Sequence, residues 1–80
     1  MNKEIVNAVN KKQFQLMMDS EKELKKYLNA DTSGRPQATW SGLFNKIEQL
    51  LTTISTCQDR IMLLQQIMDS EELLKKIKSE

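Results

Sequence analysis

The chain has 80 residues, a formal net charge of +1, no histidine and one cysteine. A chain this short forms at most one domain, and it buries only about 60% of its unfolded surface, so it gains stability from a staple or a partner. The near-neutral charge lacks the electrostatic footprint of a nucleic-acid-binding protein. The absence of histidine removes the commonest general base and the commonest zinc ligand.

The sequence contains no candidate membrane span or signal peptide. No apolar run approaches the roughly 20 residues that cross a bilayer, and residues 1–9 lack the apolar core of a signal peptide. The single cysteine, Cys57, excludes an intrachain disulfide and fits a reducing compartment. We therefore expect one soluble, cytoplasmic domain over residues 1–80.

Residues 2–29 have the pattern of a first helix. Their apolar side chains recur mostly at steps of three and four, which places them along one helix face. The stripe is weaker at its start, where valine, asparagine and lysine are plentiful. Its members are Val6, Val9, Phe14, Met17, Leu24 and Leu28, with Gln13 and Glu21 aligned between them.

A loop is expected over about residues 30–40, because this stretch collects residues that favour turns. Gly34 can adopt a positive φ, and Pro36 prevents a helix from running through Arg35. Trp40 and Phe44 form an apolar group with their neighbours where the next helix begins. This group either staples the tip of the hairpin or anchors a partner.

A long helix is predicted over about residues 41–78, since no proline follows Pro36 and no glycine follows Gly42. Thr56 with Asp59, or Asp69 with Glu72, could form a capping box and break it near 56 or 69. We favour a continuous helix because neither place carries turn residues. The fold class is therefore all-α: an antiparallel helical hairpin with a long second helix, or a three-helix bundle if that helix breaks. Its apolar stripe comprises Leu43, Ile47, Leu50, Leu51, Ile54, Cys57, Ile61, Leu64 and Met68.

The apolar surface of the long helix is too wide for one covering helix. Leu50 and Leu51 are adjacent, and residues 61–64 are all apolar. The first helix can cover about two thirds of the long one, which leaves apolar residues near the C-terminus without an intrachain cover. Each large aliphatic side chain contributes roughly 1.5–3 kcal/mol when it is buried. A second chain, either a copy or another protein, is therefore expected to complete the core. Some of Ile67, Leu73, Leu74 and Ile77 are expected to lack an intrachain cover.

No catalytic, cofactor or metal site is predicted. Cys57 has no histidine or second cysteine to act with, and it lies on the apolar stripe, where a small core residue is expected. The two glycines stand apart and form no phosphate-binding loop. Asp19 and Glu23 have helical spacing beside lysines, as solvated surface carboxylates do. We therefore expect that the protein is not an enzyme.

The predicted function is a small protein–protein interaction module with a chaperone-like or adaptor-like role. It is expected to bind a helix of another protein, or itself, through the wide stripe. Nucleic acid is an unlikely partner; the alternative is a small nucleic-acid-binding or phage-type regulatory protein. The phosphate contacts of that alternative would come from Lys11, Lys12, Lys25, Lys26, Lys75, Lys76 and Lys78. The residues expected to bind a partner are Leu50, Ile54, Ile61, Met62, Met68, Leu74 and Ile77.

About half of the chain resembles the small helical-hairpin co-chaperones of type III secretion needle subunits. The resemblance consists of residues 24–28 before the turn, Gly34 within it, and Gln37, Trp40 and Glu48 leading into the apolar residues Leu50, Leu51 and Ile54. It implies a bacterial cytoplasmic protein that pairs with a second chaperone and keeps a polymerising subunit soluble. This chain differs in carrying a longer C-terminal stretch, residues 61–80.

Overall fold

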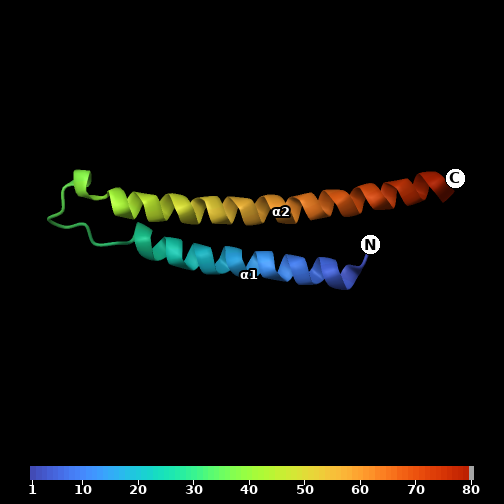
Figure 1. Ribbon diagram of the computed structural model, residues 1–80, viewed down its shortest axis with the longest axis horizontal. Coiled ribbons are helices and arrows are strands. Elements are labelled where there is room, and N and C mark those ends of the chain that lie inside the picture. The colour runs from blue at the N-terminus through green and yellow to red at the C-terminus, as the bar shows by residue number, and fades with distance from the viewer. Residues whose placement is uncertain (80) are drawn as a thin grey trace.

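Two antiparallel helices make up nearly all of the computed structural model, which describes residues 1–79 and their side chains through residue 78 (Figure 1). Helix α1 spans Lys3–Leu28 and helix α2 spans Ser41–Ser79, while a short 3₁₀ helix, η1, spans Gln37–Thr39 in the connection. The molecule is a rod of 69 × 20 × 14 Å. The predicted all-α hairpin with a long second helix is confirmed.

Asparagine side chains close both ends of α1. The Asn2 Oδ1 atom accepts hydrogen bonds from the backbone N–H groups of Glu4 and Ile5 at 2.9 and 3.2 Å. At the other end, the Asn29 Nδ2 atom donates to the Lys25 carbonyl at 2.8 Å. These bonds satisfy backbone groups that lack partners within the helix, so they fix where α1 begins and ends.

The loop is held by its own polar and aromatic groups. The Asp31 Oδ1 atom accepts from the backbone N–H of Ser33 at 2.9 Å, and Gly34 has a φ of 75°. The Trp40 indole N–H donates to the Arg35 carbonyl at 3.3 Å, and its ring lies 6.0 Å from that of Phe44, centroid to centroid. The aromatic group at the start of α2 thus closes the hairpin tip, as the stapling interpretation predicts.

Helix α2 runs without a break through the two places where the sequence offers an alternative. The hydroxyls of Thr52 and Thr53 donate to the carbonyls of Glu48 and Gln49, at 2.9 and 3.0 Å, within the helix. Threonine in a helix can satisfy its hydroxyl in this way, so the threonine-rich stretch does not end α2. A break near 56 or 69 is wrong, and with it the three-helix bundle.

The helices meet along a seam in which contact positions recur in alternating steps of three and four residues. This seven-residue period is typical of coiled-coil packing. The α2 positions are those that the sequence predicts, without Leu51. The seam comprises Val6, Asn10, Gln13, Met17, Ser20, Leu24 and Tyr27 of α1, with Leu43, Ile47, Leu50, Ile54, Cys57, Ile61, Leu64 and Met68 of α2; all are buried or half-buried.

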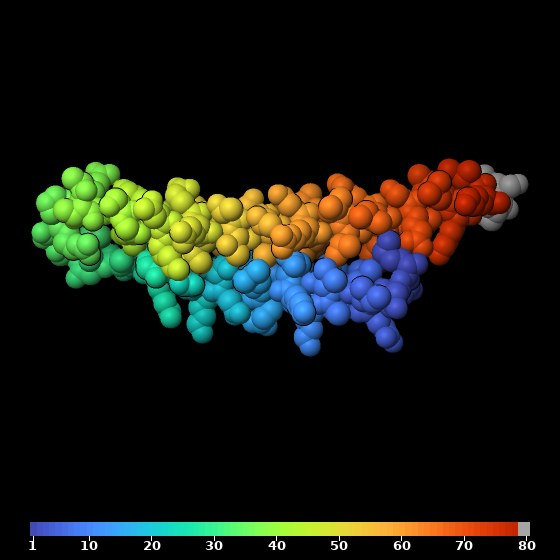
Figure 2. Space-filling model, viewed as in Figure 1, coloured from blue at the N-terminus to red at the C-terminus, as the bar shows by residue number. Residues whose placement is uncertain are grey.

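Helix α2 extends past the start of α1, as Figures 1 and 2 show. The α-amino group of Met1 contacts Glu71 Oε1 at 2.8 Å, which fixes where α1 begins along α2. Beyond this point Leu73, Leu74 and Ile77 remain more than half exposed. The expectation that α1 covers only part of α2 is confirmed.

We predict that Leu50→Ala lowers the free energy of unfolding by about 2–4 kcal/mol, because a seam leucine that is 7% exposed leaves a cavity when it is truncated. Leu73→Ala is the matched control, since this leucine on the same helix is 59% exposed. It is expected to change stability by less than about 0.5 kcal/mol. Urea unfolding followed by circular dichroism measures both, and equal effects would contradict the seam.

Candidate interaction faces

The hairpin buries few of its large hydrophobic side chains and exposes many of them. Among the described residues, the buried hydrophobic side chains are those of Val6, Leu50 and Cys57, whereas fifteen large hydrophobic residues are exposed. Scattered exposed apolar residues are normal on a protein surface, but contiguous patches of several hundred Å² mark interaction sites. Most of the exposed hydrophobic residues of this hairpin fall into two groups, one on each side of the seam.

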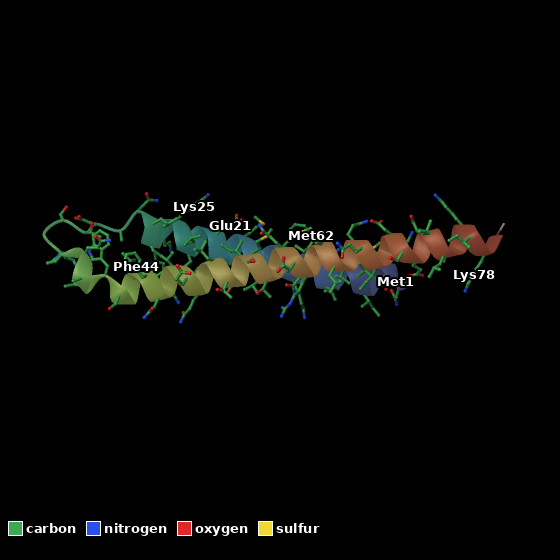
Figure 3. The ribbon with its side chains drawn as sticks, turned by 90° about the horizontal axis from the view of Figure 1, so that it is seen from above. Met1, Glu21, Lys25, Phe44, Met62 and Lys78 are labelled. Atoms are coloured by element: carbon green, nitrogen blue, oxygen red, sulfur yellow. The ribbon has the colours of Figure 1, made fainter. Side chains whose placement is uncertain are left out.

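One group lies on the side of the hairpin that Leu28 and Phe44 share, because these two residues line the same hollow at the loop end. Steps of seven return to the same side of the seam, which adds Phe14 from α1 and Leu51 from α2. Met18 and Met62 follow at helical spacing, and Figure 3 shows Met62 along the same edge as Glu21 and Lys25. We call this the front face: Phe14, Met18, Leu28, Phe44, Leu51 and Met62, all exposed.

The second group lies on the opposite side, which the ion pair between Lys46 Nζ and Glu23 Oε1 identifies at 3.6 Å. Steps of seven from Glu23 lead to Leu16 and Val9, and steps of seven from Lys46 lead to Ile67 and Leu74. Ile5, Leu63 and Ile77 complete this group at helical spacing. We call it the back face: Ile5, Val9, Leu16, Leu63, Ile67, Leu74 and Ile77, all exposed. It occupies the half of the hairpin away from the loop.

The seven residues predicted to bind a partner fall into two sets. Leu50 is buried against α1 and belongs to the seam of the folded hairpin. Ile54, Ile61 and Met68 are also seam residues, half-buried between the helices. The remaining three are exposed: Met62 on the front face, and Leu74 and Ile77 on the back face.

The sequence pattern identified Gln13 on the α1 stripe but missed the other polar seam residues, Asn10 and Ser20. Phe14 and Leu28, expected in the buried stripe, are 46% and 61% exposed. Asn10 and Gln13 take seam positions, and their amide oxygens are buried without a hydrogen-bond partner among the described residues. The spacing of the α2 stripe could have identified these residues. The same alternating steps of four and three residues, started at Val6, lead to Asn10, Gln13 and Ser20.

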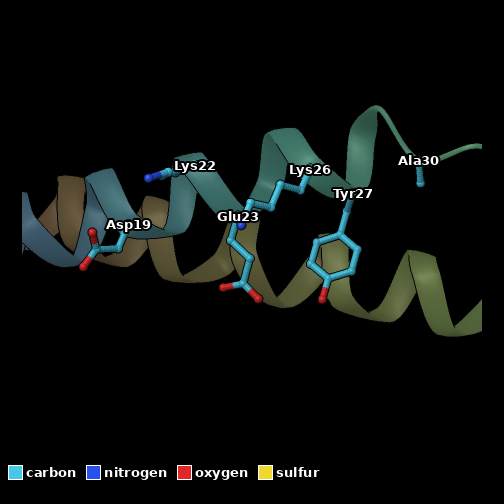
Figure 4. A pocket seen from close by; sticks show the side chains of 6 residues that line it. All are labelled: Asp19, Lys22, Glu23, Lys26, Tyr27 and Ala30. Carbon is cyan, nitrogen blue, oxygen red and sulfur yellow. The ribbon is translucent and has the colours of Figure 1, made fainter.

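Charged residues spread along the rod rather than gathering in one place. A shallow hollow on α1, shown in Figure 4, is lined by Asp19, Lys22, Glu23 and Lys26 beside Tyr27. Opposite charges alternate there at helical spacing. The lysines of the nucleic-acid alternative occupy the middle of α1, its loop end and the far end of α2, so the fold forms no single basic patch from them.

Hydrogen bonding lowers the pKa values of two carboxyl groups. The pKa of Glu71 is lowered first by the hydrogen bond from the Met1 amino group, and then by the positive charges of that group and of Lys75, whose Nζ atom lies 3.8 Å away. The pKa of Asp31 is lowered by its hydrogen bonds from Ser33. Both groups serve the fold, one at the start of α1 and the other in the loop.

Within residues 1–79, no cluster of three or more metal-binding side chains is present, and no helix is long and apolar enough to cross a membrane. Cys57 is a free thiol that is 1% exposed, as expected for a core residue. No known protein family matches the chain, and no curated protein or solved structure matches it either.

We predict that Gln13→Leu raises the free energy of unfolding by about 1–2 kcal/mol, because it removes a buried amide oxygen that has no partner. Gln15→Leu is the matched control on the same helix, since Gln15 is exposed and bonds only to Asp19. Thermal or urea unfolding measures the change in the free energy of unfolding for both variants. Destabilisation by Gln13→Leu would mean that its amide has a partner in solution.

Because the pKa of Glu71 is lower in the folded protein than its ordinary 4.5, its contribution to stability is present above about pH 4.5. That contribution is lost as the pH falls through the lowered folded value. The difference in unfolding free energy between the wild type and Glu71→Gln should therefore shrink between pH 6 and pH 3. A difference that does not vary with pH would refute the linkage.

Proposed function

We propose that this hairpin is a protein–protein interaction module that takes an amphipathic helix of another protein on its back face. The observation that supports this most is the grouping of exposed apolar residues into faces, set against a core with only three buried hydrophobic side chains among the described residues. A chain with this balance gains further apolar burial, and with it stability, when a partner covers the exposed faces.

The back face has the form that a docked helix requires. Val9 and Leu16 on α1 lie on the same side as Ile67 and Leu74 on α2, so a helix placed there contacts both. Leu63, Gln66, Ile67 and Leu74 line a shallow hollow on the α2 part of this face. Amphipathic helices bind such surfaces with apolar residues at steps of three and four.

The role is chaperone-like or adaptor-like. A partner helix seated on the back face has its own apolar stripe removed from water, which keeps an aggregation-prone segment soluble. The front face lies on the opposite side of the seam and remains open when the back face is occupied. Two faces of this kind allow the rod to hold two chains at once, as an adaptor does.

The proposal is tested with a photo-crosslinking residue placed at Ile67 on the back face, or at Gln15 on the outer edge of α1 as the control. In cells that express the protein naturally, the first position should capture one or a few defined proteins, because a docked helix lies within reach of Ile67. The control should capture none of them, since Gln15 is exposed outside both faces.

Leu74→Asp should reduce the Ile67 capture by at least about tenfold, since it buries an unpaired charge in the interface, while the helical content stays unchanged. Equal capture from both crosslinking positions, or capture that survives Leu74→Asp, would contradict a binding site on the back face.

A further inference from the structure

The front face carries a stripe that is complementary to itself. Along α1, Phe14, Met18, Glu21, Lys25 and Leu28 follow one another in steps of four and three. All five side chains are exposed, and among residues 1–79 neither Glu21 nor Lys25 forms an ion pair within 4.0 Å. The stripe thus has apolar residues at its ends and one acid and one base at its centre.

An antiparallel copy of this stripe matches four of its five residues, while Phe14 faces position 32 of the other chain, in the loop after α1. When Glu21 of one chain faces Lys25 of the other, two-fold symmetry places the first chain's Lys25 against the second chain's Glu21. The same register sets Met18 against Leu28, and Leu28 against Met18. Two ion-pair layers at the centre are then enclosed by two apolar layers, which is the pattern that selects partner and orientation in antiparallel helix pairs.

The neighbouring helix widens this contact. Phe44 and Leu51 of α2 are each 45% exposed on the same side of the hairpin. Together with Phe14, Met18 and Leu28 they present apolar area on the order of 500 Å². Two front faces in contact therefore bury at most on the order of 1,000 Å² of apolar surface, near the lower limit of about 1,200 Å² for stable interfaces.

The charge pattern distinguishes a second copy from an unrelated partner. An unrelated amphipathic helix requires only an apolar stripe, and a charged pair at the centre of that stripe imposes a desolvation cost. Against the same stripe in the opposite direction, each charge meets one opposite charge, which gives two ion pairs in the dimer. From this match and the available area, we propose that the front face binds a second copy of this chain, forming an antiparallel four-helix dimer about a two-fold axis between Glu21 and Lys25.

The dimer extends the proposed function to the other side of the hairpin. Because the two use different faces, an experiment can contradict one without contradicting the other. The dimer uses the front face, so Leu74→Asp on the back face should leave it intact. Sedimentation equilibrium over a dilution series measures the dissociation constant of each purified variant, and circular dichroism checks that its helical content is unchanged.

The decisive variants reverse the two charges. Glu21→Lys places lysine against lysine at both symmetric contacts, and Lys25→Glu places glutamate against glutamate. Each should raise the dissociation constant by roughly tenfold or more, because two attractive contacts become repulsive. The double variant, Glu21→Lys with Lys25→Glu, restores both pairs and should dimerise like the wild type. An equimolar mixture of the two single variants should form heterodimers, since their stripes are mutually complementary.

A disulfide experiment tests whether the α1 helices of the two chains are antiparallel in the dimer. Met18→Cys mixed with Leu28→Cys should give an oxidised heterodimer, whereas each variant alone should give much less, because position 18 faces position 28 of the other chain. The buried Cys57 can stay in place. A monomeric wild type at millimolar concentration, a dimer that is insensitive to the single charge reversals, or a dimer that is lost with Leu74→Asp would overturn the inference.

Discussion

One helix can cover only one stripe of another, and this constraint governs the whole molecule. Helix α2 carries apolar residues on its seam, on both flanks and beyond the reach of α1, whereas α1 covers the seam alone. The hairpin therefore leaves most of its large hydrophobic side chains at the surface. The hydrophobic effect that holds the two helices together also favours association with further chains.

The composition of the α1 seam adds to this imbalance. Asn10, Gln13 and Ser20 occupy positions that face an apolar partner stripe, and the buried amide oxygens of Asn10 and Gln13 accept no hydrogen bond from the described part of the chain. Polar groups at such positions reduce stability but fix register and orientation in helical assemblies. The hairpin is thus held in one alignment by its loop and its terminal ion pair, with a core of modest strength.

The fold could be predicted because its signals are local. Pro36 and Gly34 mark the loop, and the regular spacing from Leu43 to Met68 identifies the seam of α2, which the structure places against α1. The α1 seam could not be predicted from hydrophobicity, since Phe14 and Leu28 are more apolar than the Gln13 and Ser20 that face α2. Only the register between the helices determines which residues are covered, and that register depends on the loop and on contacts far apart in the sequence.

The division of the exposed apolar residues into two faces could not be predicted, for the same reason. The sequence shows that the apolar surface of α2 is too wide and that its C-terminal end lacks a cover, but not which residues beside the seam stay exposed. Leu50 and Leu51 are both in the predicted stripe, yet one is 7% and the other 45% exposed. The division into two faces depends on the pairing of Glu23 with Lys46 and on the hollow shared by Leu28 and Phe44, which are tertiary features.

The position of Cys57 has a consequence for how this molecule can be observed. Its thiol is the sole sulfhydryl of the chain and lies in the seam midway along α2, with 1% of the residue exposed. A thiol reagent reaches it only when the helices separate, so the rate of its modification measures the opening equilibrium of the hairpin. Any chain that binds across the seam or clamps either face slows that reaction, which makes the native cysteine a built-in sensor of assembly.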